Sequence, residues 1–306
     1  MPVTITSRPT SAKSDPWSFL LPAQHQTTTA PDEILHSGNA GLIIHRVGQV
    51  AYEFRDEARE FARSLQQHNN QVLHPYATAF VYEEVFGRQE RLHWLIHMRA
   101  PNDYGRLLEM VEHDSDFKEI AQGDRLTDRG GGNWERMFGE ATFQETVIVP
   151  QHGLTHADED DDLDGLFAAP AHHQTDQPAD RMLHSANACA IVHRRAQVKY
   201  EMRKEGRQFA YEWQEHINRA LAGEATIFLY EETWGRQDRI HWLIHLRTLD
   251  AYRHLMRLAE TDDDFRALLD KQFVAPHKGG GTWGRMFVEG SINDTVLVPH
   301  TARTGR

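Results

Sequence analysis

The sequence has a single cysteine, fewer basic than acidic residues and no long apolar run. Among its 306 residues Cys189 is the single cysteine, so no disulfide can form within the chain, and we expect a reducing compartment. Acidic residues outnumber Lys and Arg by 45 to 33, which gives a net charge of −12. Nucleic acids and anionic membranes attract basic surfaces, so this charge argues against both as partners.

Membrane insertion and secretion are also disfavoured by the sequence. No apolar run reaches the roughly 20 residues that a membrane-spanning helix needs. The N-terminal stretch lacks a basic region followed by an apolar core and a small-residue cleavage site. We therefore expect a cytoplasmic protein.

The chain instead contains one unit written twice. Residues 91–99 return almost unchanged as residues 239–247, so that His93 matches His241 at an offset of 241 − 93 = 148. One inserted residue is then enough to align the glycine triplet at 130–132 with that at 279–281. A repeat of this length predicts two domains of the same fold.

The composition along the chain sets the expected boundaries. The start is rich in Ser, Thr, Pro and Gln, and an acidic run separates the two repeats. We predict a flexible N-terminal arm, or an extended strap, at 1–33, a first repeat at 34–152, an acidic linker at 153–181, a second repeat at 182–300 and a tail at 301–306.

The apolar spacing within each repeat alternates between strand and helix periodicities. In the first repeat it predicts a strand in 40–50, a helix from 50 to 65, a hairpin of 77–84 and 91–99, a helix through 104–111 and a strand at 146–149. This order, β-α-β-β-α-β, is that of a ferredoxin-like α+β fold.

Two such units in tandem resemble the dimeric α+β barrel superfamily, in which two ferredoxin-like units set their sheets against each other. The resemblance covers both repeats and rests on topology and duplication. It implies a single-chain barrel and a range of activities, including antibiotic-biosynthesis monooxygenases that oxidise aromatic polyketides without metal or flavin, polyketide cyclases, isomerases, haem-handling proteins and ligand sensors. A fold of this kind does not by itself assign a function.

The spacing of His93 and His97 resembles a metal motif, but the residues between them alternate with period two. That alternation marks a strand, in which residues four apart are separated by about 13 Å, too far for one ion. It also places His93, His97 and Arg99 together on the face opposite Trp94, so we expect them to line the space between the two sheets.

The hairpin connects these histidines to the preceding strand. A tight turn centred on residues 88–89 predicts that Glu84 faces His93 and that Phe80 faces His97. Directly opposed side chains lie about 5 Å apart at Cβ, so a Glu–His contact is expected. A carboxylate beside an imidazole fixes its tautomer and raises its basicity, as in a positioned general base.

Together with these inner-face residues, the resemblance implies an oxygenase or cyclase that acts on an aromatic polyketide-like substrate without a cofactor. Histidine would remove a phenolic or activated C–H proton, the resulting carbanion would react with oxygen or close a ring, and Arg and Tyr would stabilise the enolate. The expected catalytic residues are His93, Glu84, His97, Tyr82 and Arg99 with their equivalents His241, Glu232, His245, Tyr230 and Arg247. The expected substrate-binding residues are Phe80, Trp134, Phe228 and Trp283.

Three alternatives stay open at this level. His93, Glu84, His241 and Glu232 could surround one ion, a ligand set that suits iron, zinc or manganese, or the barrel could handle haem. The chain could bind a ligand without catalysis. Duplication alone could also preserve these matches, with the tryptophans anchoring the glycine loops in the core. The tandem arrangement is compatible with a monomer or a homodimer.

Overall fold

The computed structural model describes residues 20–151 and 169–301. The first 19 residues of the predicted arm, the acidic run of the linker and most of the tail lie outside the described residues. None of the described helices is both long and apolar enough to span a membrane.

Each repeat has the predicted order of elements, and its second helix is split in two. Unit 1 consists of β1 (Leu42–Gln49), α1 (Arg55–Val72), β2 (Ala77–Val85), β3 (Arg91–Met98), α2 (Tyr104–His113), α3 (Ser115–Gln122), α4 (Trp134–Met137) and β4 (Gln144–Pro150). Unit 2 consists of β5 (Ala190–Gln197), α5 (Arg203–Ala220), β6 (Ala225–Trp234), β7 (Arg239–Leu246), α6 (Leu249–Thr261), α7 (Asp263–Asp270) and β8 (Asn293–Pro299).

The split in the second helix has a local cause. Asp114 ends α2, and its carboxylate accepts a hydrogen bond from the Phe117 backbone N–H at 2.7 Å, which caps the start of α3. In unit 2, Asp262 caps α7 in the same way through the N–H of Phe265 at 2.9 Å. The sequence periodicity had indicated one helix here.

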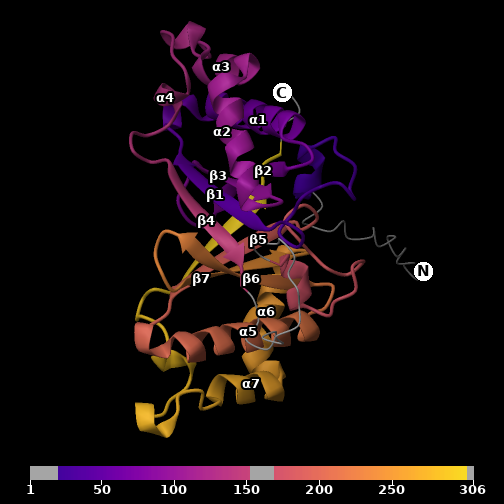
Figure 1. The fold of residues 1–306 in the computed structure, drawn as a ribbon, viewed down its shortest axis with the longest axis vertical. Coiled ribbons are helices and arrows are strands. Elements are labelled where there is room, and N and C mark those ends of the chain that lie inside the picture. Colours follow the sequence, from indigo (N-terminus) through magenta and orange to yellow (C-terminus); the bar gives the residue numbers. More distant parts are fainter. Residues whose placement is uncertain (1–19, 152–168, 302–306) are drawn as a thin grey trace, which may run out of the picture.

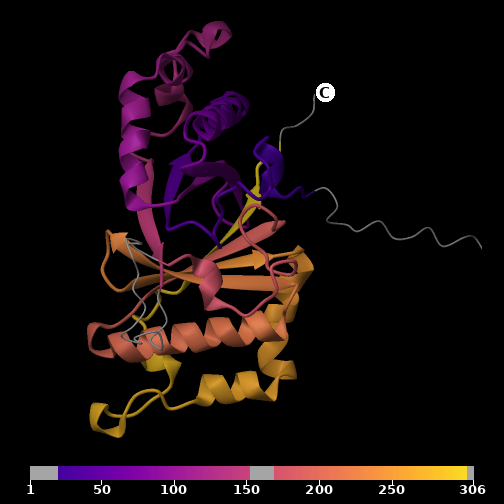
Figure 2. The same ribbon diagram turned by 45° about the vertical axis from the view of Figure 1, so that its right-hand side comes forward.

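The eight strands form a closed barrel. Each unit contributes a four-stranded antiparallel sheet, ordered β4-β1-β3-β2 in unit 1 and β8-β5-β7-β6 in unit 2. The sheets join edge to edge where β2 pairs with β8 and β4 pairs with β6. The helices of the two units cover opposite outer sides of the strands (Figure 1; Figure 2). The predicted dimeric α+β barrel within one chain is confirmed.

The predicted inward and outward faces of the strands are confirmed as well. Along β3, Trp94 and Ile96 point outward and pack beneath the helices of unit 1. Leu95 points inward, where it packs with Phe80 and Tyr82 in a separate apolar cluster inside the barrel.

The predicted hairpin register is wrong by two residues. Tyr82, not Glu84, pairs directly with His93, and Thr78, not Phe80, pairs directly with His97. The connection between β2 and β3 spans residues 86–90, and Phe86 (φ 56°) and Glu90 (φ 58°) adopt left-handed conformations. This longer connection moves the centre of the hairpin toward the N-terminus.

Part of the predicted flexible arm is an ordered strap. Residues 23–26 form a 3-10 turn in which Ala23 is fully buried. The Gln26 carboxamide accepts from the Val81 N–H at 2.8 Å and donates to the Val81 carbonyl at 2.7 Å, so it acts as a substitute strand partner for β2. Gln174, from the end of the linker, binds the backbone of Leu229 in β6 through the same pair of hydrogen bonds.

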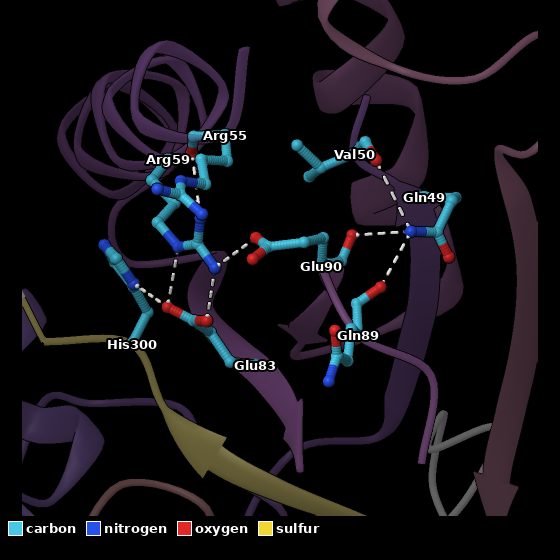
Figure 3. Close-up of polar contacts among 8 residues, drawn as sticks. All are labelled: Gln49, Val50, Arg55, Arg59, Glu83, Gln89, Glu90 and His300. Atoms are coloured by element: carbon cyan, nitrogen blue, oxygen red, sulfur yellow. Dashed lines mark hydrogen bonds and ion pairs between the residues drawn. The ribbon is translucent and has the colours of Figure 1, made fainter. Parts of the chain in front are cut away.

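An ion network fastens unit 2 to unit 1 beside β2 (Figure 3). Arg59 of α1 makes two hydrogen bonds to Glu83 of β2, at 3.0 and 2.8 Å, and contacts Glu90 at 2.6 Å. His300, which follows β8, contacts Glu83 at 2.8 Å. Burial alone would raise the pKa of Glu83, but the contacts from His300 and Arg59 outweigh it and lower the pKa to about 2.

This network predicts a measurable loss of stability in Glu83→Gln. The substitution removes the charge that Arg59 and His300 share, and hydrogen bonds to charged groups are typically worth about 1.5–3 kcal/mol. We expect the free energy of unfolding in urea to fall by about that amount. Glu109→Gln, at an exposed position of α2, is the control. Equal losses in both variants would show that the network contributes nothing.

Candidate functional site

Two chains of polar side chains lie inside the barrel. In unit 1, Glu84 Oε2 lies 3.2 Å from His93 Nε2, and His93 Nδ1 lies 2.8 Å from His45 Nε2. All three side chains are buried, and Glu84 reaches His93 diagonally across the sheet in spite of the shifted register. We call this trio the Glu–His–His chain of unit 1.

Unit 2 repeats the arrangement with a looser end. His241 Nδ1 lies 2.8 Å from His193 Nε2, while His241 Nε2 is 3.5 Å from Glu232 Oε2 and makes no hydrogen bond to any described residue. The two chains meet in the middle of the barrel, where the rings of His45 and His193 pack edge to face with centroids 4.8 Å apart. His45 and His193 recur in the repeat, but the sequence did not indicate which face of their strands they occupy.

Hydrogen bonding fixes the tautomers of the Glu–His–His chain. The Glu84 carboxylate accepts from His93 Nε2–H, so His93 Nδ1 carries a lone pair and accepts from His45 Nε2–H. Burial lowers the pKa of His93, and the contact with Glu84 only partly offsets that effect. The contact with Glu84 acts on the pKa of His93 in the expected direction, but desolvation outweighs it.

His97 and His245 join the two units. His97 Nδ1 donates to the Thr78 carbonyl at 3.1 Å, and its Nε2 accepts from the Ser185 hydroxyl at 2.9 Å. His245 makes the equivalent contacts, 2.8 Å from the Ser37 hydroxyl. The two serines also exchange backbone N–H bonds to each other's hydroxyl oxygens, at 3.0 and 2.9 Å. We call these two histidines and two serines the serine–histidine clasp.

The predicted catalytic tyrosines contact the serines of the serine–histidine clasp. Tyr82 donates its hydroxyl hydrogen to the Ser185 carbonyl at 2.6 Å, and Tyr230 donates to the Ser37 carbonyl. Both rings are fully buried. His97 and His245 have both ring nitrogens occupied, so in this conformation none of these four groups has a free polar atom to offer a substrate.

The predicted arginines do not line the barrel. Arg99 and Arg247 are exposed, because β3 ends at Met98 and β7 at Leu246, before the alternation can carry these side chains inward. The expectation that they stabilise an enolate inside the barrel is therefore wrong.

The barrel interior is closely filled at the predicted phenylalanine positions. Phe80 and Phe228 are fully buried and pack against His97 and His245, with ring centroids 5.7 and 5.5 Å apart. They do point inward as predicted, but they form core with Leu95.

The residues inside the barrel do not fit the metal alternative. His93 uses both ring nitrogens within its own Glu–His–His chain, and His241 uses its Nδ1. Across 20–151 and 169–301, no group of three or more His, Cys, Asp or Glu is placed to hold an ion. An iron, zinc or manganese ion at Glu84 and His93 would have to break their hydrogen bond, and Glu232 with His241 Nε2 offers only two ligands.

A cavity of about 590 Å³ lies on the outer side of the sheet in unit 1. Five of the thirteen residues that line it are aromatic, and the lining comes from α1 to α4, β1, β3, β4 and the segment before β4. The aromatic residues are Phe61, Trp94, Phe117, Trp134 and Phe143, and the charged residues are Arg46, Lys118, Glu135 and Glu145. We call it the outer cavity.

Trp134 holds both of the roles considered for it. Its ring packs edge to face on Phe143 with centroids 5.4 Å apart, which anchors the loop after the glycine triplet, and it also lines the outer cavity. Trp94 approaches the same phenylalanine at 5.9 Å. At the cavity wall Arg46 forms an ion pair with Glu145.

The corresponding region of unit 2 is packed differently. Trp213 stands where unit 1 has Leu65, and its ring packs edge to face on Trp242 with centroids 5.8 Å apart. The guanidinium of Arg194 lies 5.2 Å from the Trp213 ring. Trp283 stacks on the core residue Phe209, so it anchors its loop.

The haem alternative assumed ligands among the inner histidines and glutamates, and the outer cavity, as far as the chain is described, offers no further haem ligand. Among the described residues that line it there is no His, Cys, Met or Tyr, the side chains that usually ligate haem iron. A haem placed there would lack an axial ligand from the wall.

The serine–histidine clasp predicts a specific pH dependence. Burial is the largest effect and lowers the pKa of both His97 and His245 to about 3, against about 6.5 in the unfolded chain. Between these values the unfolded chain binds more protons, so stability is complete above pH 6.5 and falls as the pH drops toward 3. Each histidine adds a slope of up to about 1.4 kcal/mol per pH unit.

Urea unfolding between about pH 4.5 and 7.5 measures this slope. We expect the double variant His97→Gln, His245→Gln to be less stable than the parent at neutral pH and to depend less steeply on pH. His113→Gln, at an exposed site, should leave the slope unchanged. An unchanged slope in the double variant would contradict the assignment.

Comparison with known proteins gives remote structural likenesses. A protein from Lactobacillus acidophilus NCFM provisionally named a monooxygenase superposes with a TM-score of 0.49 and 9% identity, over 85% of this chain and 93% of that chain. An anthrone oxidase-like protein gives 0.49 and 9%, over 87% and 94%. A haem-binding protein from Thermus thermophilus gives 0.46 and 11%, over 86% and 92%.

A search of curated protein sequences gives no match to the chain. One family model covers nearly its whole length, from residue 12 to residue 305. The chain belongs to the family described as a family of unknown function (DUF6039).

Proposed function

We propose that this chain is a small-molecule enzyme, an oxygenase or cyclase, which binds an aromatic polyketide-like substrate in the outer cavity of unit 1. The observation that supports the proposal is the composition of the cavity wall, with five aromatic rings and four charged side chains around about 590 Å³. Small-molecule sites are typically concave and mainly apolar, with a few polar groups that orient the ligand.

The aromatic rings would hold a flat substrate. Trp94 and Trp134 both pack against Phe143, at 5.9 and 5.4 Å between ring centroids. Offset and edge-to-face contacts of this kind favour a further aromatic ring and select against a flexible aliphatic chain.

The charged residues of the cavity would supply the chemistry. Arg46 and Lys118 would stabilise a substrate hydroxyl as its anion, and Glu145 or Glu135 would accept the proton. The resulting electron-rich carbon would then react with molecular oxygen or close a ring. No metal or flavin is required in this scheme.

These groups replace the histidine base expected from the sequence. Trp94 lines the outer cavity, whereas its neighbour His93 lies on the opposite face of β3, inside the barrel. A histidine that points into the barrel cannot reach a substrate on the other side of the sheet.

Leu65→Trp tests the site by copying unit 2. Trp213 shows that the fold accommodates an indole at this position, so we expect a folded variant whose outer cavity is filled. Binding of anthrone, a flat aromatic probe with an activated methylene, should weaken at least about tenfold, or about 1.4 kcal/mol. Quenching of tryptophan fluorescence measures it, with Trp213→Leu as the matched control in unit 2. Equal affinity for the parent and Leu65→Trp would place the probe elsewhere.

Turnover distinguishes an enzyme from a binding protein. An oxygenase consumes oxygen in an electrode when anthrone is added, a cyclase acts on a suitable polyketide without oxygen, and a ligand-binding protein does neither. We expect Glu145→Gln to lower kcat by about 10²–10⁴, as loss of a general base does. Glu135→Gln is the matched carboxamide variant within the same wall. If both variants retain full activity, neither carboxylate is the base.

A further inference from the structure

Arg195 breaks the symmetry of the barrel interior. It follows the inward-pointing His193 by two residues on β5, where it pairs with His241 of β7 and Asn293 of β8. The equivalent position in unit 1 is Val47, at the offset of 148. An arginine therefore lies half-buried at one end of the barrel where the duplicated strand carries an apolar side chain.

Arg195 has no carboxylate partner among the described residues. Its Nη2 donates a long hydrogen bond to the Asn293 side-chain oxygen at 3.4 Å, and no Asp or Glu of the described chain lies within ion-pair distance. Burial lowers its pKa, and the nearby charge of Arg239 lowers it further, while Glu232 and Glu84 act in the opposite direction. An arginine in such surroundings is costly unless its charge is balanced.

The carboxylates at this end of the barrel are already engaged. Glu84 accepts the backbone N–H of Arg88 at 2.6 Å, contacts His93, and lies 3.5 Å from Arg91 Nη1. Glu232 has the equivalent neighbours, with Arg239 Nη1 at 3.5 Å. Each carboxylate is thus shared among several donors before Arg195 is counted.

The charges do not sum to zero. Three guanidinium groups, from Arg91, Arg195 and Arg239, face two carboxylates, and burial keeps the four histidines behind them neutral. The end of the barrel therefore carries one uncompensated positive charge. Arg91 Nε is in addition a buried donor that finds no acceptor in the described part of the chain. A buried N–H of this kind costs free energy until an acceptor reaches it.

We propose that Arg195, with Arg91 and Arg239, forms a binding site for a small carboxylate at this end of the barrel. One negative charge balances the cluster, and a planar carboxylate matches the fork of a guanidinium group through two parallel hydrogen bonds. All three arginines are half-buried, which leaves access from outside. This site is separate from the outer cavity, which lies across the sheet.

Acetate is the probe for the test, compared with chloride at equal ionic strength. We expect a saturable rise in Tm of several degrees with acetate, because a ligand that binds the folded state alone stabilises it. Isothermal titration calorimetry should give about one acetate per chain. The parent protein showing the same Tm in acetate and chloride would overturn the proposal.

Arg195→Val copies the residue of unit 1 and should abolish the acetate-dependent rise. In chloride its Tm should equal or exceed that of the parent, since the substitution removes an unpaired charge. A merely structural arginine would instead lower the Tm in chloride. Arg195→Lys keeps the charge without the fork and should weaken acetate binding about tenfold. Arg88→Ala, an exposed arginine in the nearby hairpin, is the control and should bind acetate as the parent does. Full acetate affinity in Arg195→Val would contradict the assignment.

Discussion

The serine–histidine clasp is the contact on which the closed barrel depends. Two imidazoles are buried completely, and each is compensated at both nitrogens, by a carbonyl of its own unit and by a serine of the other unit. Because the hydroxyls of Ser37 and Ser185 also accept the opposite backbone N–H, neither unit can satisfy these groups alone. Separating the units would leave several buried polar groups unpaired, and each costs roughly 1–3 kcal/mol. Fusion of the two units in one chain keeps the partners together.

A barrel closed in this way is filled with its own side chains. The candidate substrate site therefore lies outside the barrel, in the outer cavity. Phe80, Phe228 and the two tyrosines fill the interior together with the inner histidines, which are tied into hydrogen bonds. Since side chains alternate along a strand, β3 separates His93 from Trp94 by the thickness of the sheet. Because of this alternation, β3 places His93 inside the barrel and Trp94 in the wall of the outer cavity.

The fold could be predicted from the sequence because two signals were clear. The fixed offset identified two copies of one domain, and period-two alternation identified the strands and their two faces. The sequence failed for the hairpin register, since a five-residue connection with left-handed Phe86 and Glu90 has no distinctive residue pattern. It also placed Arg99 inward by extending the alternation one residue beyond the end of β3. The outer cavity was missed because its walls come from segments far apart in the chain, each of which looks like ordinary core. Aligning the two units would have given one signal, the replacement of Leu65 by Trp213.

The places where the two units differ carry more functional information than the places where they agree. The two units must carry the same residues at the clasp, because each unit supplies hydrogen bonds that the other needs. That identity is explained by structure and implies no function. No such requirement explains why Leu65 corresponds to Trp213 in the alignment, or Val47 to Arg195, since each unit has the same fold with its own residue at these positions. One difference leaves unit 1 with the outer cavity, and the other adds an unbalanced guanidinium at the end of the barrel. A duplicated barrel of this kind can keep the residues that join its two units unchanged while other positions vary. Ligand binding can then differ between the units at the varied positions.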